Sequence, residues 1–235
     1  MSSDSSALFS SAVRAAPTSR SFSFNRNRTI LLLEAGVGFA LIMATVWTRT
    51  TTQRRLFWIS AAYFLGWTLV AAWKRVRRQW KVSLPPFKVS ATLIMGALLL
   101  AAGMLAVAGA VGTLHGLFGV RNPLRHAASY LLWALIQQII QQTFFLPRFE
   151  QLTQRGLLAT FIAASLFAVA HIPNPVLTPA TFLGGWILGE LYRRYRSVLP
   201  LGMAHGVVGI AIACSFPDHL QHHMRVGVSY LLYVH

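Results

Sequence analysis

Apolar residues in this chain form long, nearly uninterrupted blocks that short polar and basic gaps separate. The blocks are residues 30–48, 56–73, 89–113, 129–147, 156–172, 176–192 and 197–215. Blocks of about 17–24 residues let an α-helix cross ~30 Å of hydrocarbon, and they lack the period-two alternation of a membrane β-barrel. The pattern predicts an all-α, polytopic transmembrane helical bundle of seven helices. It predicts eight if the short apolar stretch Val226 to Val234 belongs to a helix that starts near Leu220.

The polar segments suggest how the chain is organised. Residues 1–28 are rich in Ser and Arg and have no apolar core, which predicts a disordered basic tail, with a transit peptide as the alternative. We expect the N-terminal transmembrane helices in residues 29–128 and the helices that carry functional motifs in residues 129–215. Residues 216–235 form a His-containing C-terminal segment, the part that an eighth helix would use.

Composition and charge support a membrane protein. The chain is 55% apolar and 11% charged, a balance that is typical of a protein dissolved in a bilayer. Fifteen of the 21 Lys and Arg residues lie in the N-terminal tail or in alternate gaps, which predicts a cytosolic N-terminus, and we expect a bacterial cytoplasmic membrane. The net charge of +16 therefore indicates anionic lipid headgroups and no nucleic-acid partner.

Polar residues inside the apolar blocks are the candidates for function, because each is costly in hydrocarbon without a partner. The fourth block holds Gln137, Gln138, Gln141 and Gln142. They form two i,i+4 pairs, which predicts a ribbon of amides along one side of a helix. Taken alone, this ribbon is well explained by hydrogen bonding between helices, at about 0.6–2 kcal/mol per bond.

Two histidines extend this polar set. Phe167 and His171 lie four residues apart on one face of the fifth block, just before Pro173 ends the helix. His205 lies near the middle of the seventh block. Each histidine alone is equally well explained by a bond to a backbone carbonyl, but together with the glutamines they predict a single site.

These residues resemble the CPBP family of intramembrane proteases, which includes CAAX-processing enzymes, bacteriocin-processing proteins and abortive-infection homologues. The resemblance covers about residues 129–215. The family pattern is a Glu-Glu pair followed by Arg, then Phe-x-x-x-His, then His-x-x-x-Asn on separate helices. Phe167 and His171 match the second motif, and His205 matches the histidine of the third, with a similar lead-in at residues 197–200.

The chain departs from that pattern at the first and third motifs. Gln141 and Gln142 occupy the positions of the Glu pair, and an amide cannot act as a general base. Leu146 stands at the position of the Arg, although Arg148 follows two residues later. Gly209 stands at the position of the Asn, and the loss of one oxyanion donor typically lowers a rate by ~10²–10³.

The resemblance implies roles for these positions. In the family, the first motif activates a water, the second-motif histidine orients it and the third motif stabilises the oxyanion. The implied catalytic set is Gln141, Gln142, His171 and His205, and the implied supporting set is Gln138, Phe167, Gly209 and Arg148.

Two hypotheses follow. In the first, the protein is an intramembrane peptidase that acts on membrane-associated peptides or proteins, with His171 or His205 as the base. In the second, it is a degenerate homologue that binds or regulates a membrane partner without cleavage. Both require the glutamines and the two histidines to converge on a water-accessible pocket. With a cytosolic N-terminus, however, we expect His171 at the non-cytosolic end of its helix and Gln142 nearer the cytosolic end of its own.

Other chemistry is less favoured. We expect no cofactor and no metal, since two histidines and neutral amides would bind zinc poorly, and the sequence DHLQHH from Asp218 to His223 is better explained as a solvated segment. A transporter is disfavoured because the chain shows no inverted repeat. A carboxylate that replaces the missing Glu pair would have to come from the five acidic residues of the chain, which are Asp4, Glu34, Glu150, Glu190 and Asp218.

Overall fold

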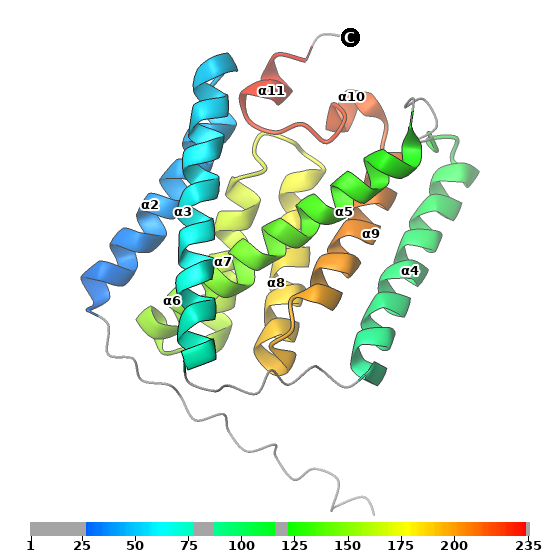
Figure 1. Cartoon of the computed structure of the whole chain (residues 1–235). Coiled ribbons are helices and arrows are strands. Elements are labelled where there is room, and N and C mark those ends of the chain that lie inside the picture. Colours follow the sequence, from blue (N-terminus) through cyan, green and yellow to red (C-terminus); the bar gives the residue numbers. More distant parts are fainter. Residues whose placement is uncertain (1–26, 78–86, 116–121, 234–235) are drawn as a thin grey trace, which may run out of the picture.

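The computed structural model describes residues 27–77, 87–115 and 122–233, and these residues form a bundle of helices (Figure 1). Its elements are α2 Arg28–Trp47, α3 Thr50–Arg77, α4 Phe87–Ala110, α5 Pro123–Ile139, the π-helix η2 Ile140–Phe145, α6 Leu146–Thr153, α7 Gly156–Val169, α8 Leu177–Tyr195, α9 Leu199–Ser215, α10 Asp218–Gln221 and α11 Val228–Leu231. The predicted all-α fold is confirmed. The predicted tail lies outside the described residues up to residue 26, and α2 already begins at Arg28 with Asn27 as its N-cap.

Within the described residues, three helices are long and apolar enough to cross a membrane by themselves. They are Arg28–Trp47, Thr51–Trp73 and Phe87–Ala110. Large apolar side chains on these helices are exposed, including Leu33, Trp58 and Leu99 at 61%, 70% and 67%. Exposed apolar faces of this size are expected where a helix meets lipid.

The fourth predicted block is one helical run with a change of pitch. It starts with Pro123 at the N-terminus of α5 and passes through η2 into α6, which ends at Gln154 in the left-handed region (φ 56°). Pro147 lacks a backbone N–H and would disturb a uniform helix interior, and here it lies within the first two positions of α6. The wider turn of η2 carries Gln141 and Gln142, both of which are buried.

Small residues let α5, α7, α8 and α9 approach one another closely. A Cβ at Gly185 would lie 3.5 Å from Ala164 Cα on α7. On α9, a Cβ at Gly202 would lie 2.9 Å from the Cα of Leu135 on α5. Close backbone approach through small residues is the usual way that membrane helices pack. α9 is therefore held between α5 and α4, with which it makes extensive contacts.

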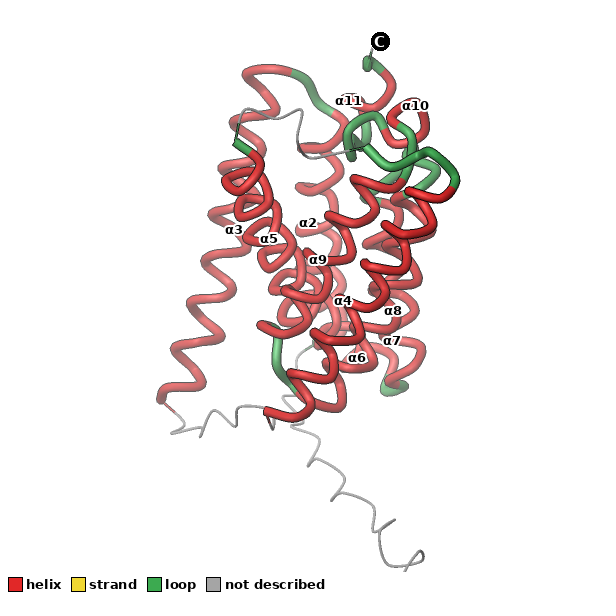
Figure 2. Tube along the Cα trace, turned by 90° about the vertical axis from the view of Figure 1, so that its right-hand side faces the viewer, coloured by secondary structure: helices red, strands yellow, loops and turns green. Residues whose placement is uncertain are grey.

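The C-terminal segment does not form an eighth spanning helix within residues 216–233. It contains only the four-residue helices α10 and α11, each about 6 Å long, and both lie at the end of the bundle where the C-terminus is drawn (Figures 1 and 2). The physical reason is that His222, His223 and Met224 all have positive φ, which reverses the chain after α10. Asn174 stabilises this turn, because its Nδ2 donates to the carbonyl oxygens of Gln221 and Arg225 at 2.8 and 2.9 Å.

Candidate functional site

A cavity of about 860 Å³ lies between α2, α4, α5, α8 and α9. Its walls are mostly apolar, and one part of the wall carries the polar groups that the sequence singled out. The lining residues with polar side chains are Lys88, Thr92, Tyr130, Gln137, Gln138, Gln141, His171, Thr181, Tyr195 and His205. A concave apolar pocket with a few convergent polar groups is the usual form of a ligand site.

Six of the eight predicted site residues line this cavity, and they come from η2, from helices α5, α7 and α9 and from the turn after α7. They are Gln138, Gln141, Phe167, His171, His205 and Gly209. Gln142 is fully buried and does not line the cavity, but it donates a hydrogen bond to Gln138, which does. Arg148, the remaining residue, lies elsewhere.

A chain of amide hydrogen bonds connects Gln142 to His205. Gln142 Nε2 donates to Gln138 Oε1 at 3.0 Å, and Gln138 Nε2 lies 3.1 Å from His205 Nδ1. With the amides in this orientation, Gln138 has only hydrogens to offer the ring, so His205 Nδ1 accepts and the hydrogen of the neutral imidazole is on Nε2. His205 therefore presents an N–H donor.

His171 is held in the opposite tautomer. Its Nδ1 lies 2.7 Å from the carbonyl oxygen of Phe167, which can only accept, so Nδ1 carries the hydrogen and Nε2 is left as an acceptor. The Phe167 ring packs edge-on against both imidazoles, with centroid distances of 4.8 Å to His171 and 5.7 Å to His205. His171, with an acceptor nitrogen, and His205, with a donor N–H, therefore both pack against the Phe167 ring.

The course of α5 explains how the glutamines meet histidines from two other segments. Figure 1 shows α5 crossing the bundle obliquely in front of α8 and α9. This course brings Gln138 against His205, near the middle of α9. The expected mismatch in depth concerned His171, and His171 lines the same cavity as Gln138 and Gln141.

Arg148 does not take part in the cavity, in contrast to the supporting position implied by the sequence. Its Nε and Nη2 both lie 2.9 Å from Glu34 Oε2 on α2, and its Nη1 donates to the Phe144 carbonyl at 2.7 Å. The guanidinium also stacks 3.6 Å from the Phe144 ring centroid and 4.6 Å from that of Trp67. The π-turn of η2 adds a residue to the preceding turn, which shifts the face that later side chains occupy.

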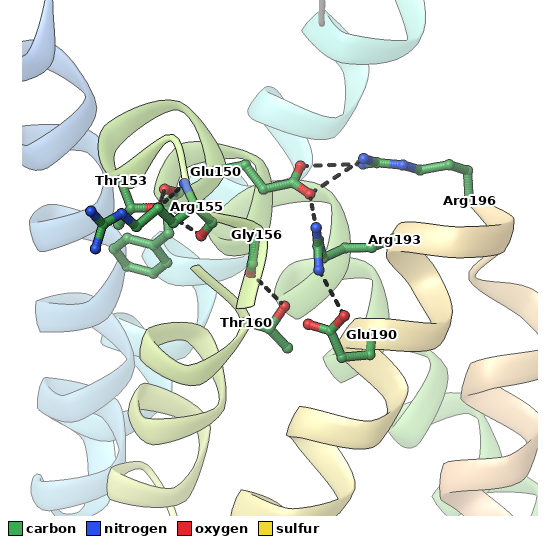
Figure 3. Close-up of polar contacts among 9 residues, drawn as sticks. Glu150, Thr153, Arg155, Gly156, Thr160, Glu190, Arg193 and Arg196 are labelled. Carbon is green, nitrogen blue, oxygen red and sulfur yellow. Dashed lines mark hydrogen bonds and ion pairs between the residues drawn. The ribbon is translucent and has the colours of Figure 1, made fainter. Parts of the chain in front are cut away.

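The other described carboxylates also lie away from the cavity. Figure 3 shows Glu150 between Arg193 and Arg196, and Glu190 beside Arg193. The N–O distances from Glu150 are 3.2 and 3.3 Å, and that between Glu190 and Arg193 is 2.7 Å. Asp218 lies 3.0 Å from His223. Each of the four described acids therefore has a cationic or imidazole partner, and none lines the cavity. Among the described residues, no three His, Cys, Asp or Glu side chains are grouped as metal ligands.

Tyr130 is a cavity residue that the sequence reasoning missed. Its ring lies against Gly209, because a Cβ at that glycine would collide with the Tyr130 hydroxyl. Tyr130, Ala134 and Gln138 follow i,i+4,i+8 spacing on one face of α5. That spacing was the available signal, since the face that carries Gln138 continues upstream to Tyr130.

Comparison with known proteins bears on the same segment. Residues 119–211 match a family model described as type II CAAX prenyl endopeptidase Rce1-like. The resemblance to the CAAX-processing proteases is confirmed. This Rce1-like segment contains all eight predicted site residues. Together with the long apolar helices, the match indicates an integral membrane protein that is similar to the CAAX-type peptidases over this segment. No curated protein and no solved structure matches the chain.

Proposed function

We propose that this protein binds a membrane-associated peptide or protein in its cavity and does not cleave it. The observation that carries the proposal is the charge of the site. Within the described part of the chain, no carboxylate lines the cavity, and its polar wall carries glutamines, histidines and Lys88. The carboxylates lie elsewhere, paired with arginines or beside His223. An amide cannot remove a proton from water, so the usual carboxylate route to hydrolysis is closed.

The same groups are suited to holding a peptide. His205 Nε2–H matches a backbone carbonyl, and His171 Nε2 matches a backbone N–H. The apolar walls from α4 and α8 suit apolar side chains or a lipid chain attached to the peptide. A neutral polar end within an apolar cavity favours an uncharged stretch of peptide over a charged one.

Hydrolysis is the second candidate, and the geometry of His171 favours it. The ring is oriented by the Phe167 carbonyl, which leaves Nε2 as an unprotonated base in a cavity. In this mechanism a water gives its proton to Nε2 while its oxygen adds to the scissile carbonyl, and the departing amine then takes that proton. Gln138 and Gln142 would act only through His205.

The full-length protein in lipid nanodiscs is expected to bind a fluorescent farnesylated CAAX peptide and leave it intact. Binding is measured by fluorescence anisotropy, and cleavage is measured by mass spectrometry of the peptide after prolonged incubation. A non-lipidated version of the same peptide reports how much the lipid chain contributes. Cleavage that disappears in His171→Ala would contradict the binding proposal and establish the hydrolase. No detectable association with either peptide would refute both.

His205→Ala is expected to weaken this binding about 3- to 10-fold, because it removes a donor and leaves Gln138 Nε2 without its acceptor. The matched control is His126→Ala, which truncates an exposed histidine on α5 outside the cavity. His126→Ala should bind as the unmodified protein does. Equal affinities for all three proteins would show that the peptide does not contact the imidazole site.

A further inference from the structure

The Tyr130 hydroxyl lies against α9 at Gly209, in the space that the Cβ of any other residue would occupy. The ring atoms Cε1 and Cζ lie 2.7 and 2.8 Å from where a Cβ on Gly209 would be, and the hydroxyl lies closer still. Such distances are far below van der Waals contact, so only glycine at position 209 lets the phenol lie against the α9 backbone. The glycine and the tyrosine therefore form one structural unit.

This hydroxyl faces the cavity without a hydrogen-bond partner among the described residues. Tyr130 and Gly209 both line the cavity wall, and the side chains beside them there include Trp133, Val208 and Ile212. A half-buried phenol in apolar surroundings normally finds a partner, because an unmade hydrogen bond costs free energy. A ligand in the cavity is the natural source of that partner.

The position of the hydroxyl matches a second contact on the same ligand. Gly209 follows His205 by four residues, about one turn or ~6 Å along α9. A peptide in extended conformation rises ~3.3 Å per residue, so peptide groups two residues apart lie ~6.6 Å from each other. One extended chain along α9 can therefore offer a carbonyl to His205 and another to Tyr130.

We infer that Tyr130, seated over Gly209, is a second anchoring donor that binds a backbone carbonyl of an extended peptide in the cavity. This inference rests on the proposed peptide binding and adds the orientation of the bound chain, which runs along α9 from His205 toward Gly209. The tyrosine supplies a neutral donor on a rigid aromatic ring, with little conformational entropy to lose on binding. The cavity is thus selective for a ligand with regularly spaced carbonyls.

Tyr130→Phe tests the donor with minimal change of shape. The variant is expected to bind the farnesylated CAAX peptide in nanodiscs about 3- to 10-fold more weakly than the unmodified protein. Tyr192→Phe is the matched control, because Tyr192 is buried in the hydrophobic core and does not line the cavity. Its affinity should not change. If Tyr130→Phe binds as tightly as the unmodified protein, the anchoring role is wrong while the proposed peptide binding stands.

A paired exchange separates donation from packing. Tyr130→Ala makes room for a side chain at position 209. The double variant Tyr130→Ala/Gly209→Asn then supplies a side-chain donor from α9 in place of the one lost from α5. The double variant Tyr130→Ala/Gly209→Leu supplies a side chain of similar volume without a donor. The Asn variant is expected to recover at least half of the loss in binding free energy that Tyr130→Ala causes, and the Leu variant less. Equal recovery in both would assign Tyr130 to packing and overturn the inference. A failure of the unmodified protein to bind would instead count against the proposed function itself.

Discussion

Replacing Arg148 by Ala is expected to lower the free energy of unfolding by about 3–5 kcal/mol, the range found when one partner of a buried ion pair is removed. The side chains of Arg148 and Glu34 are only 7% and 11% exposed, and their nitrogen and oxygen atoms are 2.9 Å apart. The variant also loses the contacts of the guanidinium with the Phe144 and Trp67 rings. Denaturant unfolding in detergent micelles, followed by tryptophan fluorescence, measures the change.

Arg193→Ala is the matched control for this prediction. Arg193 pairs with two carboxylates, Glu150 and Glu190, whereas Arg148 pairs with Glu34, but the Arg193 side chain is 28% exposed and water screens its charge. Its truncation should cost about 1 kcal/mol or less. A combined Glu34→Leu/Arg148→Met exchange should recover most of the stability that Arg148→Ala loses, because neither charge is then left buried alone. Equal losses for Arg148→Ala and Arg193→Ala would show that burial of the Glu34 pair has no effect.

Gly202→Ala is expected to destabilise the bundle by about 1–3 kcal/mol through overpacking. The added methyl group would lie 2.6 Å from Leu135 Cδ1 and 2.9 Å from Leu135 Cα. The side-chain atom can rotate away, but the backbone atom moves only if α5 and α9 separate. Since α5 carries Gln138 and α9 carries His205, the separation should also lengthen the contact between them.

Gly103→Ala on α4 provides the control for the glycine exchange. A Cβ at Gly103 would meet no atom within 4 Å. Because alanine favours a helix over glycine by up to ~1 kcal/mol, this variant should be as stable as the unmodified protein or slightly more so. Thermal melting of both variants in the same detergent checks the comparison. A similar loss in both would indicate that close packing of α5 against α9 is not the cause.

Helix placement and the helical faces that carry the polar side chains could be predicted from the sequence because both depend on local patterns. An apolar block of spanning length forms a helix wherever it is placed in a membrane, which is why the predicted blocks coincide with helices from α2 to α9. The i,i+4 spacing of the glutamines and of Phe167 and His171 places each group on one helical face. The predicted division of the chain, the cytosolic N-terminus and the bacterial membrane stay predictions.

The partners of these residues were decided only by the tertiary structure. Arg148 pairs with Glu34, which lies 114 residues earlier in the sequence. The Phe144 carbonyl orients the Arg148 guanidinium after a π-turn, and the hydrophobic pattern of the sequence does not predict that turn. Local patterns determine which face a side chain occupies, whereas the opposing residue depends on how helices distant in sequence cross. The contact between Tyr130 and Gly209 belongs to this second kind, because it exists only where the oblique α5 meets a glycine of α9.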